Sequence, residues 1–291
     1  MNSPFLFDYQ INCYSDCNYK TNLPFAVFAL TQQGLYHKTL NVNNQDSGSI
    51  YLGKHIIVGA VADGCTSGKN INGRSNNQVG AHIGSYLVLR AVRKLVLKKR
   101  LEINEDFISH FEQEFFLRHK QLLNALNPWK LERDFVISNM FLTTIIFFII
   151  CENKYLIANC GDGDVIVNNN FKNLDEHAGK YFAANLRNPR KIESGIQWLN
   201  PERRFNLIEI GNTENLNSIF IATDGFLDED IKQHYCFSKF FLKKFEEKAL
   251  PGFTDKRTQF RKDFLTPILQ TKGNKTWPED DATFISVNRT N

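Results

Sequence analysis

No stretch of this sequence reaches the roughly 18 to 20 continuous apolar residues that a membrane-spanning helix needs. The longest apolar segment, residues 141–151, is interrupted by Thr143 and Thr144 and is followed by the polar residues Glu152, Asn153 and Lys154. Residues 1–16 also lack the basic-then-apolar pattern of a signal peptide. We therefore expect a cytoplasmic protein that has no membrane partner.

Paired cysteines of the zinc-binding kind are missing as well. The 6 cysteines do not form the two C-x-x-C pairs that are typical of structural zinc sites. They stand at positions 13, 17, 65, 151, 160 and 236. Cys13 and Cys17 could bind a metal or form a local disulfide, but they lack partners, so reduced thiols are the simpler expectation.

A strong excess of one charge is also absent. The chain has 35 basic and 31 acidic residues, a net charge of +4. Basic residues are spread along the sequence except between Arg90 and Arg100. That cluster falls in a predicted helix and is more typical of a solvated helix face than of a nucleic-acid patch, so we expect no nucleic-acid partner. Internal repeats, low-complexity tracts and the Gly-x-Ser-x-Gly turn of nucleophilic hydrolases are missing too.

Short apolar runs bounded by turn residues are present and predict buried strands. The expected strands are residues 25–30, 50–62, 141–150, 154–159, 165–168, 205–210, 218–222 and 283–288. Apolar residues at four-residue spacing predict a helix over 75–99 with Ser75 as its N-cap, and Phe107, Phe111 and Phe115 mark one face of a second helix over 104–125. A late helical region spans 235–270, interrupted by Pro251 and Gly252. This order favours two packed antiparallel sheets with helix pairs outside over a parallel doubly wound sheet.

Four acidic motifs lie in turns, and three of them adjoin predicted strands. They are Asn44-Gln45-Asp46, Ala62-Asp63-Gly64, Thr223-Asp224-Gly225 and Asp280-Asp281-Ala282-Thr283. A single Asp-Gly pair is usually no more than a turn. Several rigid carboxylates from distant segments, however, can converge on hard divalent cations, which prefer oxygen ligands.

The identity and order of these motifs, together with Gly161-Asp162, resemble the metal-dependent protein phosphatases of the 2C type, in their bacterial branch. The resemblance extends from about residue 25 to 288. It implies an α+β fold, a four-layer αββα sandwich in which two antiparallel β-sheets are flanked by helix pairs. Because positions 46 and 280 would meet in one site, we expect residues 1–291 to form one domain, with a core over 25–288 and a peripheral segment over 1–24.

The resemblance also implies a chemistry. Such enzymes hydrolyse phosphate monoesters by attack of a water or hydroxide that bridges two Mg²⁺ or Mn²⁺ ions, and some members hold a third ion. The catalytic and metal-binding positions carry over to Asp46, Asp63, Asp224 and Asp280, with the Gly64 carbonyl, and those for a third ion to Asp162 and Asp228. Asp281 is expected to point elsewhere, because successive residues of a strand face opposite sides.

Three positions of the expected site depart from the family pattern. Many members have an Arg five residues before the first metal-binding Asp, where this chain has Asn41. Asn lacks the charged, two-pronged donor that Arg offers to phosphate. Possible substitutes are His37, Lys38, Lys69 and Arg74. Cys65 replaces a His that could act as a general acid, and Asp164 replaces an Arg for no physical reason that we can give.

Other motif readings are weaker. Residues 64–70 superficially resemble a phosphate-binding P-loop, but the glycine spacing is one residue short. Residues 162–164 resemble the start of a calcium loop without its later Gly and Glu.

Two functions remain open. One is an active serine/threonine phosphatase, expected to be monomeric, that acts on phosphorylated proteins and opposes a cognate kinase. The other is an inactive pseudophosphatase that serves as a regulatory binding module, favoured by the lost charge at position 41.

Overall fold

The structure is a computed structural model of the 291-residue chain. It describes residues 5–7, 11–15, 21–64, 76–126, 140–141, 143–172, 174, 191–192, 195–196, 205–225 and 280–290. The late helical region predicted over 235–270 lies outside these residues. So do Cys65, Lys69, Arg74, Ser75 and Asp228.

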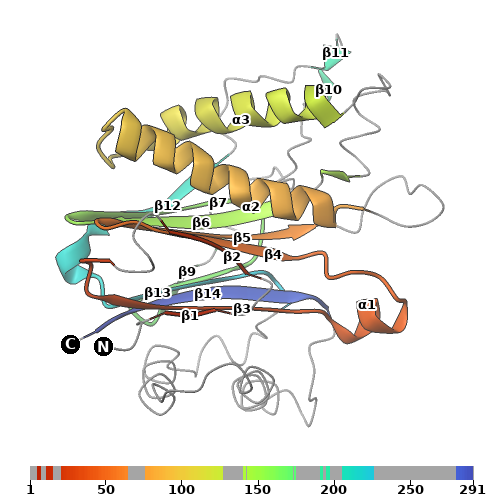
Figure 1. Cartoon of the computed structure of the whole chain (residues 1–291), viewed down its shortest axis with the longest axis horizontal. Coiled ribbons are helices and arrows are strands. Elements are labelled where there is room, and N and C mark those ends of the chain that lie inside the picture. The colour runs from red at the N-terminus through yellow and green to blue at the C-terminus, as the bar shows by residue number, and fades with distance from the viewer. Residues whose placement is uncertain are drawn as a thin grey trace.

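Two six-stranded sheets lie face to face (Figure 1). The first, here the β14 sheet, has the order β1 (Phe5–Phe7), β3 (Phe25–Gln32), β14 (Ala282–Arg289), β13 (Ser218–Ala222), β8 (Asp164–Val167) and β9 (Asn170–Lys172). The second, here the β5 sheet, has the order β12 (Asn206–Asn212), β7 (Lys154–Cys160), β6 (Thr143–Cys151), β5 (Ile56–Gly64), β4 (Ser47–Leu52) and β2 (Asn12–Ser15). A short hairpin pairs β10 (Lys191–Ile192) with β11 (Gly195–Ile196).

The two faces of the β5 sheet are both apolar, because its central strands β5 and β6 place hydrophobic side chains on both sides along most of their length. In β5, Val58 and Ala60 belong to the core beneath the helices, whereas Ile57 and Val61 belong to the core between the sheets. This alternation is what the two-residue period of a strand requires. The strand therefore carries one apolar layer on each side. This packing holds the end of the strand, where Asp63 lies, in a fixed position.

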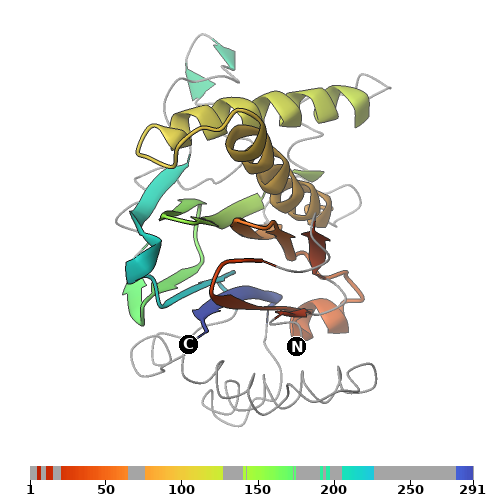
Figure 2. The same ribbon diagram turned by 60° about the vertical axis from the view of Figure 1, so that its left-hand side comes forward.

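Two long helices cover the outer face of the β5 sheet (Figures 1 and 2). They are α2 (Gln78–Arg93), which continues into a π-helical turn, η1 (Lys94–Lys98), and α3 (Phe107–Leu126). The aromatic face predicted for α3 is confirmed: Phe107, Phe111 and Phe115 are at most 1% exposed. The ring of Phe111 lies 4.5 Å from that of Phe147 in β6, which joins helix to sheet.

The basic cluster near the end of α2 is not simply the solvated face that the sequence suggested. The guanidinium of Arg93 stacks over the ring of Tyr51 at 4.4 Å. Lys94 lies 2.7 Å from Glu114 of α3, and Arg118 lies 2.6 Å from the same carboxylate. Glu114 is 5% exposed, so its two cations compensate the cost of burying its charge. Part of the cluster thus links α2 to α3.

The expected α+β sandwich is confirmed, with corrections at its edges. The run 50–62 is two strands, because the chain turns at Gly53, whose N–H donates to the carbonyl of Ile56 at 2.8 Å. The sheets are antiparallel except where β1 pairs with β3 and β2 pairs with β4, both in parallel. The segment before residue 24 therefore adds an edge strand to each sheet. The second helix layer expected from the sequence falls outside the described residues.

Some helical elements differ from expectation. Helix α2 begins at Gln78 with Asn77 at its N-cap, and the predicted cap, Ser75, lies outside the described residues. A five-residue helix, α1 (Leu35–Thr39), and a 3-10 turn, η2 (Thr213–Asn215), were not predicted. Among the helices that the structure describes, none is long and apolar enough to cross a membrane.

Candidate metal centre

The apolar layer between the sheets becomes polar at one end. In β13, Ile219 and Ile221 belong to this layer, and the next residue of the same parity is Thr223. In β14, Ile285 belongs to it, and the same face continues toward the strand start through Thr283 to Asp281. At one end of the sandwich, hydroxyl and carboxyl side chains thus occupy the inward positions that aliphatic side chains fill elsewhere along β13 and β14.

Asp46 lies at this end, directly before β4, and is held from two sides. Its carboxyl Oδ2 accepts a hydrogen bond from the hydroxyl of Thr223 at 2.6 Å. Its backbone N–H donates to Oδ1 of Asn44 at 2.9 Å, while Asn44 Nδ2 donates to Thr31 in β3 at 2.8 Å. Asp46 is 3% exposed. The carboxyl is therefore buried, oriented and tied to both sheets.

Asp63 stands at the end of β5, beside Asp46. Its backbone is fixed by β6, because its carbonyl accepts the Thr143 hydroxyl at 2.6 Å and its N–H donates to Thr144 at 3.3 Å. Burial and the charge of Asp63 raise the pKa of Asp46 well above its ordinary value. Two buried carboxyls that interact in this way resist ionising together, so full ionisation of the pair needs a compensating positive charge.

Asp224 and Asp162 complete the acidic surroundings of Asp63. Burial, followed by the charges of Asp224, Asp280 and Asp162, raises the pKa of Asp63 to about 7. The pKa of Asp224 is raised by partial desolvation of its carboxyl by the surrounding chain and by the charges of Asp162 and Asp280. Asp224 is exposed and Asp162 is half-buried, so this side of the cluster faces solvent. Five carboxyls are therefore close enough to influence one another electrostatically: those of Asp46, Asp63, Asp162, Asp224 and Asp280.

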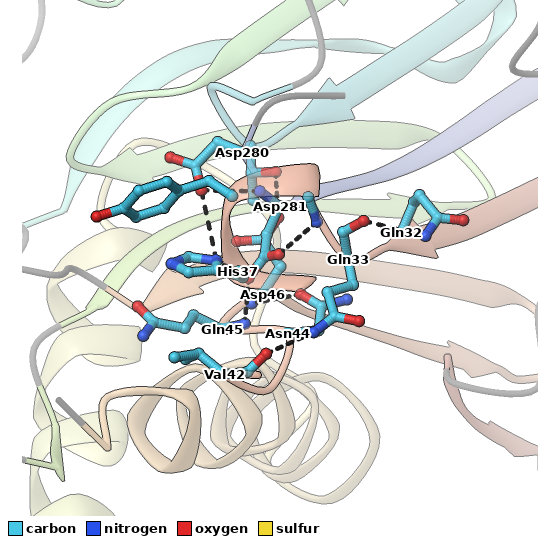
Figure 3. Close-up of polar contacts among 12 residues, drawn as sticks. Gln32, Gln33, His37, Val42, Asn44, Gln45, Asp46, Asp280 and Asp281 are labelled. Atoms are coloured by element: carbon cyan, nitrogen blue, oxygen red, sulfur yellow. Dashed lines mark hydrogen bonds and ion pairs between the residues drawn. The ribbon is translucent and has the colours of Figure 1, made fainter. Parts of the chain in front are cut away.

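Strand alternation predicted that Asp280 and Asp281, just before β14, point apart. Both carboxyls nevertheless approach His37, whose Nδ1 lies 3.6 Å from Oδ1 of Asp280 and 2.8 Å from Oδ2 of Asp281 (Figure 3). The side chain of Asp280 is 63% exposed, whereas Asp281 is 3% exposed. Asp281 accepts the backbone N–H groups of Gly34 and Gln45 at 2.7 and 2.5 Å. Burial raises the pKa of Asp281, and the two N–H donors and His37 oppose that rise.

Glycines allow these turns to approach one another closely. A Cβ atom on Gly225 would lie 1.9 Å from the carbonyl oxygen of Asp281, and one on Gly34 would lie 2.2 Å from the carbonyl carbon of Asp280. A Cβ on Gly64 would lie 2.7 Å from the backbone of Asn77, which precedes α2. Any larger residue at these positions would push acidic segments apart.

The candidate phosphate-binding residues lie on or just after α1. His37 is 4% exposed and its Nδ1 lies 2.8 Å from Oδ2 of Asp281, whereas Lys38 is exposed. Asn41 is exposed and has a φ of 53°, in the left-handed region that Asn tolerates better than most residues. The helix α1 thus ends in a left-handed turn at position 41, but Arg100 has the same φ of 53°, so this backbone conformation does not by itself account for Asn in place of Arg.

Two contributors to the site were not predicted from the sequence. Thr223 was noted only as a neighbour of Asp224, yet its hydroxyl fixes Asp46. Asp281 was set aside as pointing elsewhere, yet it joins Gly34, His37 and Gln45. The parity of the strands carried a signal for both, since Thr223 and Asp281 share the inward face of their strands with the apolar core.

The sequence profile of the family described as Protein phosphatase 2C matches residues 33–256. The chain belongs to the protein phosphatase 2C family. Among solved structures, a bacterial serine phosphatase is 13% identical with a TM-score of 0.47, over 90% of this chain and 97% of the other. Stp1 of Staphylococcus aureus is 14% identical with a TM-score of 0.46, over 90% and 94%. PstP/Ppp of Mycobacterium tuberculosis is 13% identical with a TM-score of 0.45, over 92% and 99%. A search of curated proteins found no match.

Proposed function

We propose that this phosphatase 2C family member is a metal-dependent serine/threonine protein phosphatase that acts at the cluster of Asp46, Asp63, Asp224 and Asp280. The observation that supports this most directly is electrostatic. Asp224 and Asp280 help to raise the pKa of Asp63, and Asp63 helps to raise that of Asp46. Carboxyls that keep one another protonated form a donor set that a hard divalent cation can deprotonate and hold. The donor set therefore fits Mg²⁺ or Mn²⁺.

The ligands in this proposal are the four aspartates and the Gly64 carbonyl for two ions, with Asp162 and Asp228 for a third. When bound, two such cations lower the pKa of water and neutralise the charge of a phosphate monoester. The chain itself orients the donors: Thr143 and Thr144 fix Asp63, and Thr223 fixes Asp46. Since preorganised donors need no rearrangement during the reaction, this rigidity favours catalysis.

Exposure favours a macromolecular substrate. Asp224 is exposed and the Asp280 side chain is 63% exposed, so the acidic cluster opens to solvent on that side. A phosphorylated serine or threonine on a protein surface could reach such a site, and a serine/threonine kinase would supply that substrate. The proposal also treats the chain as one domain, because Asp46 and Asp280 serve one site.

The test is hydrolysis of a phosphothreonine peptide by the purified protein, with Mn²⁺ or Mg²⁺ and then with excess chelator. Activity should require the metal. Asp63→Asn should lower kcat about a thousandfold, because bound cations contribute several kcal/mol of transition-state stabilisation. Asp106→Asn is the matched control, since Asp106 is exposed beside the start of α3. Activity that survives in Asp63→Asn or in chelator would refute the proposal.

A regulatory binding module is the second candidate, and the observation that favours it is Asn41. An exposed Asn in a left-handed turn offers no charge to a phosphate group. A module of this kind would bind Mn²⁺ but would not turn over a phosphopeptide. The same assay, combined with a direct binding measurement, separates it from an active enzyme.

A further inference from the structure

Asp281 is a buried carboxyl that is not among the proposed metal ligands. Each of its oxygens contacts a segment that is distant in the sequence (Figure 3). Oδ1 accepts the N–H of Gly34 at 2.7 Å, across 247 positions, and Oδ2 accepts the N–H of Gln45 at 2.5 Å. Nδ1 of His37 lies 2.8 Å from the same Oδ2. The Asp281 side chain thus contacts the start of α1, the middle of α1 and the residue before Asp46.

These contacts lie directly beside two proposed metal ligands. Gln45 precedes Asp46, and the carbonyl of Gln45 also accepts the N–H of Gly64, beside Asp63, at 3.1 Å. Asp281 follows Asp280, whose Oδ1 accepts the N–H of Asp281 at 2.8 Å. A displacement of Asp281 would therefore move Asp46 and Asp280 relative to each other.

His37 is the partner that Asp281 needs. A buried carboxylate is costly without a compensating partner, and the imidazole of His37, whose Nδ1 lies 2.8 Å from Oδ2, lowers that cost. His37 is 4% exposed, and its backbone carbonyl accepts the N–H of Val42 at 2.9 Å, which closes the turn after α1. The imidazole therefore joins Asp281 to a short helix whose own five residues would not be stable alone.

We propose that His37 and Asp281 form a clamp that positions Asp46 and Asp280 for binding a divalent cation. This inference rests on the proposed function, because it takes those two aspartates to be ligands. Both residues of the clamp are positioning residues that act through their neighbours. The clamp ties the 33–46 segment of the chain to the start of β14.

A direct metal site made by the clamp is the less favoured arrangement. His37, Asp280 and Asp281 do offer ligand atoms within 4.8 Å of one another. Both oxygens of Asp281, however, already accept backbone N–H groups. The Asp281 oxygens thus hold the backbone at Gly34 and Gln45 in place, as residues that orient metal ligands do.

The experiment compares Mn²⁺ affinity, measured by isothermal titration calorimetry, in matched variants at His37. His37→Leu removes the imidazole that pairs with Asp281, and we expect the Kd to rise about tenfold, the lower end of the effect of partners that orient metal ligands. His37→Asn keeps an N–H near the place of Nδ1, so its Kd should stay within about threefold of wild type. Asp281→Asn turns an amide N–H toward a backbone N–H and should resemble His37→Leu. An unchanged Kd in folded His37→Leu would overturn the proposal.

Two other histidines provide controls. His119 is 4% exposed and its ring lies 5.5 Å from that of Phe141, so His119→Leu tests the effect of losing a buried histidine elsewhere. His55 lies 2.5 Å from Glu152 in the turns opposite the acidic end of β5 and β6, so His55→Leu tests the loss of another histidine–carboxylate pair. Neither change should alter Mn²⁺ affinity. A tenfold loss in His119→Leu would mean that general destabilisation explains the effect, and would count against the clamp.

A second measurement separates the clamp from the proposed function. Amide hydrogen exchange is followed in the metal-free protein over peptides that cover residues 33–46 and, as reference, β6. His37→Leu should speed exchange in the first region and leave β6 unchanged, and His37→Asn should restore protection. Unchanged exchange over 33–46 would overturn the clamp even if Mn²⁺ binding behaves as proposed. If the wild-type protein binds no Mn²⁺, the proposed function fails, and exchange still decides whether His37 holds this segment.

Discussion

The hydroxyl of Thr223 donates a hydrogen bond to Oδ2 of Asp46 at 2.6 Å and so joins residues that are 177 positions apart. The same hydroxyl accepts the N–H of Thr283 at 2.9 Å. Thr223 thereby connects β13 and β14 of one sheet with the residue that precedes β4 of the other. Burial and the charge of Asp63 raise the pKa of Asp46, and the Thr223 hydroxyl opposes that rise. The contact favours the charged carboxylate that a cation needs.

Replacement of Thr223 by Val should weaken cation binding. The variant keeps the shape of the side chain but removes a hydrogen bond to a charged group, a loss of about 1.5 kcal/mol or roughly tenfold in Mn²⁺ affinity at pH 7. Thr223→Ser keeps the hydroxyl and should bind nearly as wild type does. Calorimetric titration of the three proteins is the measurement, and wild-type affinity in the Val variant would show that the hydroxyl does not support Asp46.

The pH dependence of stability should reveal the acidic cluster in metal-free protein. The folded-state pKa of Asp63 is raised to about 7, and those of Asp46, Asp224 and Asp281 are raised as well. The folded state therefore binds more protons than the unfolded state between about pH 4 and 7. The stability that these protons contribute is present below pH 4 and is lost as the pH rises through 7.

Urea denaturation in chelator, repeated between pH 5 and 8, measures this slope. One proton that is retained only in the folded state gives a fall of about 1.4 kcal/mol per pH unit in the free energy of unfolding. Asp63→Asn should flatten the slope, because the amide does not titrate. Excess Mn²⁺ should flatten it too, since a bound cation replaces the protons. Stability that rises with pH in the metal-free protein would contradict the clustering of these carboxyls.

Much of the fold could be predicted because its signals are local. The runs that form β5 to β8 are short and apolar and lie between turn residues, and Phe107, Phe111 and Phe115 recur at helical spacing. Strands β1 and β2 have only 3 and 4 residues. They depend on pairing with β3 and β4, which no local pattern encodes. Helix α1 was missed for a related reason, since His37 and Gly34 hold it through Asp281.

The acidic motifs identified the carboxyls of the candidate site but not the groups that orient them. Asp46 and Asp63 stand next to strands in the sequence, so their rigidity was predictable. The contact of Thr223 with Asp46 requires knowledge of which strand faces which, and this is a property of the packed sheets. Asn41 could be read from the sequence only as a missing charge, whereas the structure shows a left-handed turn.

Replacement of Gly225 by Ala should disrupt the candidate site more than a comparable change elsewhere. Its Cβ would lie 1.9 Å from the carbonyl oxygen of Asp281, so the backbone must move, and we expect the free energy of unfolding to fall by about 2 kcal/mol or more. Gly84→Ala is the control: its Cβ would meet the Cδ1 atom of Ile145 at 3.0 Å within α2, where Ala is favoured by about 1 kcal/mol. Thermal and urea denaturation compare the two, and equal stability losses would contradict the close approach of Gly225 to Asp281.

The final prediction concerns what replaces the missing arginine. Asn41 has a φ of 53°, and its N–H donates to the carbonyl of Lys38 at 3.3 Å in the turn that ends α1. Most residues other than Gly, Asn and Asp are strained by roughly 1 to 2 kcal/mol at such a backbone position. Lys38 is exposed on α1, whereas His37 is buried against Asp281. Lys38 is therefore the described candidate that can present a charge to substrate.

We expect Lys38→Ala to raise the KM for a phosphothreonine peptide about tenfold with little change in kcat, because one charge-assisted hydrogen bond contributes about 1.5 kcal/mol to binding. Lys54→Ala is the matched control, since Lys54 is an exposed lysine in the turn before β5, at the strand end opposite Asp63. Asn41→Arg should leave KM unchanged and lower stability slightly. The opposite pattern, a tenfold fall of KM in Asn41→Arg with no effect of Lys38→Ala, would show that position 41 is the phosphate-binding position and that its charge is simply missing.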